Sequence, residues 1–218
     1  MKLITIVVGA LSTNCYILVP DGAGECAVID PGGQGGRIAD ELARLGIRPQ
    51  YVLSTHGHAD HTGGAAVLMS RLGGQYALGE ADREMALNPP DWLTSLLPDF
   101  QTPPEPALLL KGGQTLEAGG VRTEVMATPG HTPGSMCYRV GGAVFTGDTL
   151  FRGSIGRYDL PGGDLDLELA SIRDHLLTLP DETLVYPGHG PSTTIGQERR
   201  SNQFLRGLAR PRGQPPSP

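Results

Sequence analysis

The sequence predicts an α+β fold in which two similar halves pack their β-sheets face to face. Each half opens with short strand-like runs and continues into a helix-like run, and polar loops follow the strand ends. The chain of 218 residues also contains 32 glycines and 19 prolines, which are scattered without a period. That composition is typical of a protein with many short strands joined by tight turns.

The first half is predicted to contain five strands and two helices. The first helix has apolar residues at helical spacing and stops at Gly46. The third strand ends in Asp30-Pro31-Gly32-Gly33, a strong turn signal. The predicted strands are Leu3–Val8, Cys15–Val19, Cys26–Ile29, Tyr51–Leu53 and Tyr76–Leu78, and the predicted helices are Ile38–Leu45 and Ala65–Leu72.

The second half repeats this order of elements. Its predicted strands are Val121–Met126, Met136–Val140, Ala143–Phe145 and Leu184–Tyr186, and its predicted helices are Leu165–Leu179 and a short one near Gly196–Leu205. Between the halves, Asn88–Pro106 carries six prolines and the only tryptophan, Trp92. We interpret this segment as a linker that covers the core; the alternative is a loop that overhangs a functional site.

Length and composition favour one domain over residues 1–208, followed by a disordered tail over 209–218 that is rich in Pro, Gly, Arg and Ser. The net charge of −6, without a basic stripe, argues against a nucleic-acid partner. No apolar run approaches the roughly 20 residues of a membrane span. The N-terminal run reads better as a β-strand than as a signal peptide. Three cysteines without a CxxC pattern indicate reduced core residues, so we expect a cytoplasmic protein.

Five of the six histidines lie in loops directly after predicted strands. One loop carries His56-Gly57-His58-Ala59-Asp60-His61, and later strands lead to His131, to Asp148 and to His189. Strand ends that each offer a metal-binding side chain are expected to converge on one rim of the sandwich. The sixth histidine, His175, falls within a predicted helix and is expected to be solvated.

The donor types point to a catalytic metal site. Imidazole and carboxylate suit Zn²⁺ and also Fe or Mn, whereas the absence of clustered thiolates disfavours a structural zinc site. An aspartate among apolar residues, such as Asp148, is costly to bury unless it binds a cation, and its two oxygens can bridge two ions. Asp30 is expected either to cap its turn or, by preference, to support a ligand through a hydrogen bond. The predicted ligands are His56, His58, Asp60, His61, His131, Asp148 and His189.

These residues resemble, position by position, the ligand set of the metallo-β-lactamase superfamily. Within it, the chain is most similar to the short glyoxalase II-like proteins (hydroxyacylglutathione hydrolases). The resemblance extends from the first strand to about Leu205. It rests on Thr13-Asn14-Cys15-Tyr16, Val28–Gly33, Thr128–Ser135, Gly147–Arg157, Asp159–Asp164 and Gly188–Glu198.

The resemblance implies a four-layer αββα sandwich and two divalent ions, most simply Zn²⁺. It implies that His56, His58 and His131 hold one ion, that Asp60, His61 and His189 hold the other, and that Asp148 bridges them. The implied reaction is hydrolysis of a thioester such as S-lactoylglutathione by a metal-bridging hydroxide. Asp60 and Asp148 are then the catalytic carboxylates, and Arg157 is the candidate for binding a substrate carboxylate, although a surface salt bridge explains Arg157 as well.

The chain differs from the larger glyoxalase II enzymes in two respects, and two alternative functions remain open. Only 29 residues follow His189, so we expect no counterpart of the C-terminal helical region with which full-length glyoxalase II binds glutathione. Gly190-Pro191 also stands where the larger enzymes have a tyrosine that contacts substrate. Persulfide dioxygenases of the superfamily use one iron, held by the residues that match His56, His131 and Asp148. A lactonase or another ester hydrolase is the second alternative.

Overall fold

The computed structural model describes residues 1–22 and 24–208, and it contains two six-stranded sheets. The first sheet has the order β1-β2-β3-β4-β5-β6, with antiparallel pairing up to β3 and parallel pairing from β3 onward. Its strands are β1 (Lys2–Val8), β2 (Thr13–Val19), β3 (Glu25–Ile29), β4 (Arg48–Leu53), β5 (Gln75–Gly79) and β6 (Leu108–Leu110).

The second sheet has the order β14-β13-β10-β9-β8-β7, and only the pair β10·β13 is parallel. A separate two-stranded ribbon joins β11 (Leu150–Phe151) to β12 (Ser154–Ile155). The strands of the second sheet are β7 (Thr115–Ala118), β8 (Val121–Ala127), β9 (Met136–Val140), β10 (Ala143–Gly147), β13 (Leu184–Pro187) and β14 (Thr193–Thr194).

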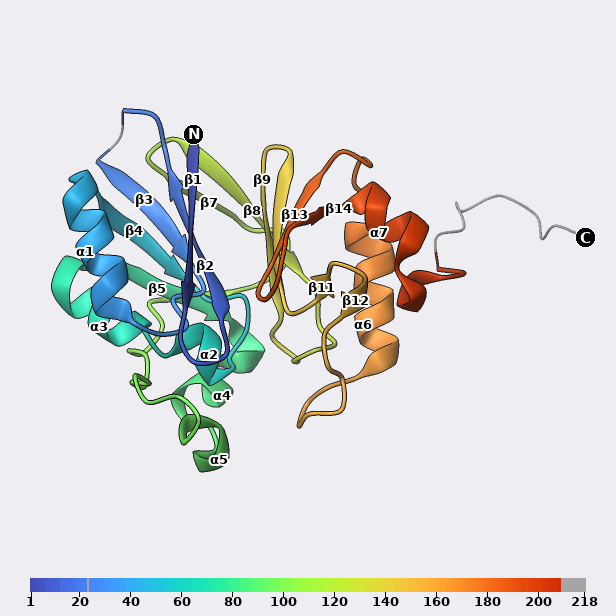
Figure 1. Cartoon of the computed structure of the whole chain (residues 1–218), viewed down its shortest axis with the longest axis horizontal. Helices are drawn as coiled ribbons and strands as arrows, with labels where there is room; N and C mark the ends of the chain where they lie inside the picture. The colour runs from blue at the N-terminus through green and yellow to red at the C-terminus, as the bar shows by residue number, and fades with distance from the viewer. Residues whose placement is uncertain (23, 209–218) are drawn as a thin grey trace, which may run out of the picture.

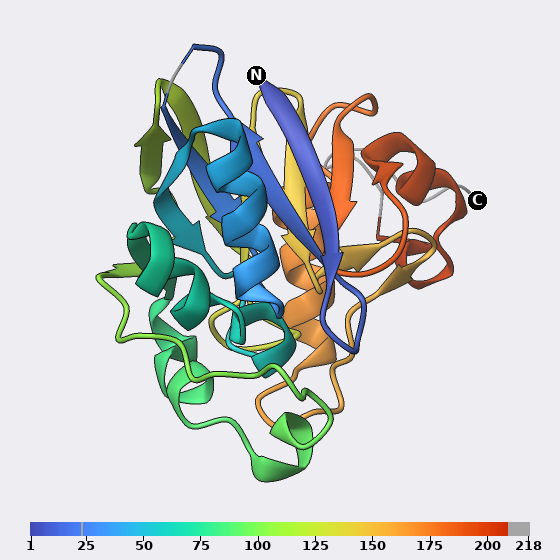
Figure 2. The same cartoon turned by 60° about the vertical axis from the view of Figure 1, so that its left-hand side comes forward.

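The two sheets face each other, and helices cover their outer faces, so the molecule has four layers (Figure 1). Helices α1 (Gly35–Leu45) and α3 (Ala65–Leu72) cover the first sheet, whereas α6 (Leu165–Ser171) and α7 (Ile195–Ser201) cover the second (Figures 1 and 2). The predicted four-layer αββα sandwich is therefore confirmed.

Side chains from both sheets form the central layer of the core. Tyr16 and Ile29 of the first sheet pack in one buried cluster with Tyr138 and Phe145 of the second. Tyr16 meets Phe145 edge to face, with ring centroids 5.0 Å apart. Two further clusters lie between each sheet and its own helices. This arrangement follows from alternation along the strands, which sends one set of side chains to the central layer and the other to the helices.

All nine predicted strands are present, and the first of them settles the N-terminal run as strand β1. The strands β6, β7, β11, β12 and β14, of two to four residues each, were not predicted. The predicted helix Leu165–Leu179 is shorter than expected: α6 passes into a π-helical turn over Ile172–Leu176. The predicted helix near Gly196–Leu205 is divided between α7 and a 3₁₀ turn over Gln203–Leu205.

The proline-rich segment Asn88–Pro106 contains a short helix, α5 (Asp91–Thr94), and packs on the loops below the first sheet (Figure 1). Its Leu93 and Leu97 are buried against Ala59 of the short helix α2 (Ala59–Thr62), whereas Trp92 is exposed. The segment thus covers one part of the molecule, as expected of a linker, and also projects side chains outward. Between β5 and this segment lie a 3₁₀ turn, Glu80–Asp82, and α4 (Arg83–Leu87).

The cysteines agree with the sequence interpretation, since Cys15, Cys26 and Cys137 are buried free thiols. Among the helices of the described ranges, none is both long and apolar enough to cross a bilayer. The predicted disordered tail over 209–218 lies outside the described residues, and the predicted domain limit at 208 stays a prediction.

Candidate metal centre

Loops that follow four strands bring the predicted ligands together at one end of the sandwich. The His56–His61 loop follows β4, the loop of His131 follows β8, Asp148 follows β10, and His189 follows β13. Ligand atoms from these loops form three groups, and within each group the atoms lie within 4.8 Å of one another. The groups are His56, His58 and His131; His56, His61 and Asp148; and Asp60, His61 and His189. All seven predicted ligands are thus in one place.

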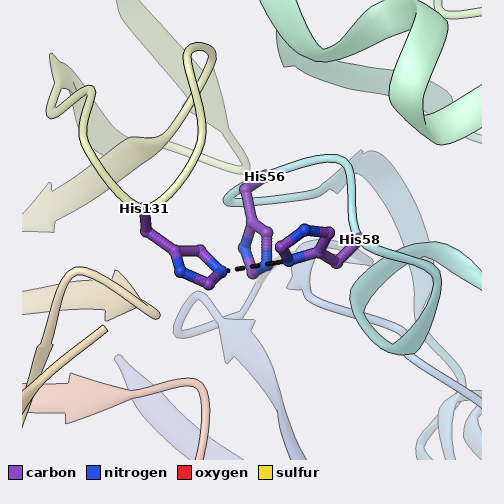
Figure 3. Close-up of side chains that lie close together, drawn as sticks. All are labelled: His56, His58 and His131. Carbon is purple, nitrogen blue, oxygen red and sulfur yellow. Dashed lines mark hydrogen bonds between the residues drawn. The ribbon is translucent and has the colours of Figure 1, made fainter. Parts of the chain in front are cut away.

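The first group is a triangle of imidazoles (Figure 3). Nδ1 of His58 lies 3.1 Å from Nε2 of His56 and 3.0 Å from Nε2 of His131. A single proton on one of these three nitrogens can serve one hydrogen bond between two of them. The lone pair of the remaining nitrogen still points into the same volume. Three nitrogen lone pairs directed at one point fit a divalent cation.

The group of Asp60, His61 and His189 combines imidazoles with a carboxylate. Nε2 of His61 lies 3.2 Å from Nε2 of His189, and Oδ2 of Asp60 lies 3.3 Å from the same His189 nitrogen. Asp60 and His61 both belong to α2, so one turn of helix places the two side chains next to each other.

Asp148 lies between the first group and the group of Asp60, His61 and His189. Its Oδ2 is 3.7 Å from Nε2 of His131 and 3.6 Å from Nε2 of His189. Its Oδ1 is buried, lies 3.3 Å from Nε2 of His61, and forms no well-directed hydrogen bond within the described part of the chain. A buried carboxylate oxygen without a well-directed donor is costly unless a cation faces it, so the residues present fit a metal site in which Asp148 would contact both ions.

The outer nitrogens of three imidazoles are held by oxygen atoms. Nδ1 of His131 lies 2.6 Å from the backbone oxygen of Arg157, and Nδ1 of His56 lies 3.1 Å from Oγ1 of Thr55. These two hydrogen bonds select the tautomer that carries its proton on Nδ1 and leaves the Nε2 lone pair free for a metal. Nδ1 of His61 lies 3.0 Å from Oδ2 of Asp30, in an electrostatic contact that lacks hydrogen-bond geometry.

Asp30 supports this shell from beneath, in agreement with the preferred sequence interpretation. It is buried at a positive φ of 52°, and its Oδ1 accepts a hydrogen bond from the Thr55 backbone nitrogen at 2.7 Å. Its Oδ2 accepts another from the Thr55 hydroxyl at 2.9 Å. One carboxylate therefore orients two histidines, His61 directly and His56 through Thr55.

The comparison with protein families agrees with this geometry. The model of the metallo-β-lactamase superfamily matches residues 8–189, which include every residue of the candidate centre. The chain belongs to the metallo-β-lactamase superfamily. Among curated relatives, it is 37% identical to the hydroxyacylglutathione hydrolase GloC of Haemophilus influenzae, over 94% of this chain and 98% of that protein.

Solved structures of superfamily members are similar over nearly the whole chain. The B3 metallo-β-lactamase BLEG-1 matches with a TM-score of 0.87 and 38% identity, over 94% of this chain and 100% of that one. The di-iron-bound form of TTHA1623 matches with a TM-score of 0.81 and 38% identity, over 93% and 100%. ETHE1 from Myxococcus xanthus matches with a TM-score of 0.78 and 28% identity, over 97% and 93%.

The charges of this superfamily centre are suited to metal binding. Burial, followed by the neighbouring imidazoles of His61 and His131, lowers the pKa of His56 well below its ordinary value. Burial, followed by His131, lowers the pKa of His58 to about 4. Burial opposes ionisation of Asp148, yet His61, His131 and His189 outweigh it and hold the carboxyl pKa well below its usual range. At His61 and His189, by contrast, burial is outweighed by the neighbouring carboxylates of Asp148 and Asp60, which raise the pKa of both imidazoles. Neutral imidazoles and an ionised carboxylate are the forms that bind metal, so an ion would displace protons from these two histidines.

The centre opens into a cavity of about 490 Å³, within the range of about 300–1,000 Å³ typical of ligand sites. Arg157 lines this cavity, and its side chain also forms two hydrogen bonds with Asp159, at 2.9 and 3.0 Å. Both interpretations of Arg157 therefore have a counterpart in the structure. His175 is exposed on the π-helical turn, away from the centre, as the sequence predicts.

Two buried carboxylates that support the superfamily centre were not singled out in the sequence. Asp82 follows β5 and accepts hydrogen bonds from the loops of His58 and His131. Oε2 of Glu168 accepts a hydrogen bond from the His131 backbone nitrogen at 2.7 Å. Asp82 shares the strand-end signal of the ligands and could have been found by it. Glu168 lies within α6 and carries no such signal.

Proposed function

We propose that this chain is a metal-dependent hydrolase that cleaves a thioester, with S-lactoylglutathione as the first substrate to assay. The observation that carries the proposal is the complete centre: seven donor side chains surround one volume that opens to a cavity. The similarity to GloC, named as a hydroxyacylglutathione hydrolase, supports a thioester as the bond that is cleaved.

Each residue of the centre has a proposed role. His56, His58 and His131 would hold one divalent ion, and Asp60, His61 and His189 the other, with Asp148 between them. We propose Zn²⁺, with Fe or Mn as alternatives; a di-iron relative of similar structure supports keeping iron open. Such ions supply Lewis acidity, which lowers the pKa of a coordinated water and polarises a carbonyl.

The chain's own residues position the reactants. Asp60 is largely buried, and its carboxylate lies at the wall of the cavity. From there Asp60 is proposed to orient the attacking water and accept its proton. His131 and Asp148 line the same cavity, so a carbonyl placed there faces both groups of ligands. Arg157 is proposed to bind a carboxylate of the substrate, for which it would exchange its present partner, Asp159.

A second candidate function is oxidation of a persulfide by a single iron. The structural similarity to ETHE1 supports it, as do His56, His131 and Asp148, a two-histidine-one-carboxylate set suited to non-haem iron. A lactone or another ester is the remaining class of substrate, and a β-lactam belongs beside it because BLEG-1 is described as a β-lactamase.

The test combines elemental analysis of freshly purified protein with assays on the same sample. We would measure hydrolysis of S-lactoylglutathione, a lactone and a β-lactam, and O₂ consumption with glutathione persulfide. About two metal ions per chain together with thioester cleavage would support the proposal. One iron per chain with O₂ uptake and no thioester cleavage would overturn the proposed reaction in favour of the dioxygenase.

A further inference from the structure

The cavity beside the metal centre has mostly apolar walls. They come from three separate parts of the chain: the loop between β1 and β2, the α5 segment, and the region that begins with the β11–β12 ribbon. The apolar side chains that line the cavity are Leu11, Trp92, Leu93, Leu96, Phe151, Ile155 and Leu160.

Three of these side chains are unusually exposed for their type. Trp92 is 56% exposed, Leu96 is 54% exposed and Leu11 is 42% exposed. Large apolar side chains that gather at one opening, in contact with water, are typical of a binding surface. The exposure of Trp92 and Leu96 is not the result of a loose segment, because Leu93 and Leu97, which lie in the same segment, are buried against Ala59. The α5 segment is anchored on one side and presents Trp92 and Leu96 on the other.

Cations are scarce in the same cavity. Among the described residues that line it outside the metal centre, Arg157 is the only charged one, and its guanidinium is already paired with Asp159. A glutathione conjugate carries two carboxylates and a chain of amide groups, all of which need polar partners when they leave water. Leucine, tryptophan, isoleucine and phenylalanine side chains offer little to such a ligand and much to an aliphatic or aromatic group.

We propose that this cavity binds an apolar group of the substrate, so that the preferred substrates are thioesters with an aliphatic or aromatic chain next to the scissile carbonyl. The reaction in this statement rests on the proposed function, whereas the binding of an apolar group does not. Trp92 and Leu96 are the specificity-determining residues. The segment Asn88–Pro106 therefore does more than cover the core: it forms one wall of the substrate site.

The chain offers a direct probe of binding, because Trp92 is its only tryptophan. Metal-loaded protein is titrated with acetate, hexanoate and decanoate, the last below its micellar concentration, while Trp92 emission is recorded. We expect decanoate to shift the emission to shorter wavelength and to bind at least tenfold more tightly than acetate. A decanoate affinity no higher than that of acetate would overturn the proposal.

Variants connect this binding to the cavity wall. Leu96→Ser should weaken decanoate binding at least fivefold and leave acetate binding unchanged; its exposure makes a folding defect unexpected. The matched control is Leu184→Ser, which alters an exposed leucine at the end of β13 remote from His189 and should bind decanoate like the parent protein. Equal decanoate affinity in the parent and Leu96→Ser proteins would contradict the assigned site.

Kinetics separate this proposal from the proposed function. We would compare kcat/KM for S-decanoyl-N-acetylcysteamine, S-acetyl-decanethiol and S-lactoylglutathione. A higher kcat/KM for either ten-carbon thioester than for S-lactoylglutathione supports the proposal. The ten-carbon thioester with the higher kcat/KM identifies whether the acyl side or the thiol side of the carbonyl enters the cavity. Decanoate binding without cleavage of any thioester would refute the proposed function and retain the apolar site. Cleavage of S-lactoylglutathione in preference to both ten-carbon thioesters would refute the apolar substrate site and retain the proposed function.

Discussion

The Asp82 carboxylate accepts a hydrogen bond from the Thr132 hydroxyl at 2.6 Å, and this contact links the two halves of the sandwich at the metal centre. Asp82 follows β5 in the first half, whereas Thr132 is the neighbour of His131 in the second. The same carboxylate also accepts hydrogen bonds from the backbone nitrogens of Gly57, at 2.8 Å, and Gly134, at 2.7 Å. Asp82 thus fixes the loops of His58 and His131 relative to each other.

We expect Asp82→Asn to weaken metal binding about tenfold or more and to lower the free energy of unfolding by about 1–3 kcal/mol. An amide nitrogen cannot accept a hydrogen bond, so at least one of the three donors loses its partner. Metal competition with a chelator and urea unfolding measure the two effects. Asp40→Asn is the control, because Asp40 forms an exposed ion pair with Arg71 and should contribute little. Parent-like metal affinity in Asp82→Asn would show that the loops hold their positions without this contact.

The position of Asp148 between two groups of potential ligands gives a second prediction. Asp148→Ala should abolish binding of two metals and lower kcat at least about a hundredfold, while the metal-free fold stays mostly intact. The physical reason is that its Oδ2 faces both groups of ligands, at 3.7 Å from His131 and 3.6 Å from His189. Elemental analysis, circular dichroism and the thioester assay on one preparation check the three parts.

His175→Ala is the matched control for Asp148→Ala, since His175 is exposed on a helix away from the centre. It should change neither metal content nor rate. Full turnover by Asp148→Ala would refute the two-metal mechanism, even if the protein still binds one ion.

Asp30 leads to a third prediction, which concerns the orientation of the histidine ligands rather than direct binding of a metal. Asp30→Asn should lower metal affinity about 10- to 100-fold. Asparagine tolerates the positive φ of this position, so the backbone turn is retained. Its amide group, however, cannot accept from both the Thr55 nitrogen and the Thr55 hydroxyl while it also contacts His61. Isothermal titration with Zn²⁺ measures the loss, and unchanged affinity would mean that the packing alone orients His56 and His61.

The parts of this centre that could be predicted from the sequence are those encoded by a local sequence pattern. The ligand loops follow strands long enough to show their periodicity, and the HxHxDH spacing concentrates four donors in six residues, so both were predictable. The wall formed by Trp92 and Leu96 was less visible. Prolines rule out long elements but do not say where a segment packs, and the anchor of this one, Leu93 and Leu97 on Ala59, is a tertiary contact.

Supporting contacts between distant parts of the chain were the least predictable. Asn14 donates hydrogen bonds to the backbone oxygens of Pro187, at 3.0 Å, and Gly190, at 2.8 Å, and so steadies the loop of His189 from the other half of the molecule. The sequence separation of such partners exceeds 170 residues. No local pattern encodes a pairing of that kind, because it exists only once the two sheets have packed.

Glu168 is a buried carboxyl group whose surroundings make it sensitive to pH. Burial, with a contribution from Asp148, raises its pKa from 4.5 to about 8, and the hydrogen bond from the His131 nitrogen opposes that rise only in part. The matched change is Glu168→Gln, which keeps a carbonyl oxygen for the His131 nitrogen and removes the titrating group. An exposed glutamate on β7, Glu117, provides the control substitution Glu117→Gln.

We expect Glu168 to contribute a loss of stability to the metal-free protein as the pH rises from about 4.5 to about 8, while His56 and His58, whose pKa is lowered, contribute in the opposite direction. Within this window the folded protein keeps the Glu168 proton that the unfolded chain has released, so the contribution of Glu168 to the free energy of unfolding falls with increasing pH and levels off above it. The full effect is on the order of a few kcal/mol. Urea unfolding at a series of pH values, after removal of metal by a chelator, isolates this contribution as a difference between proteins: the free energy of unfolding of Glu168→Gln should rise relative to the parent protein as the pH rises, and that of Glu117→Gln should not. Parallel profiles for all three proteins would mean that Glu168 is ionised in the folded state at neutral pH, and that its charge is stabilised by groups other than the His131 nitrogen.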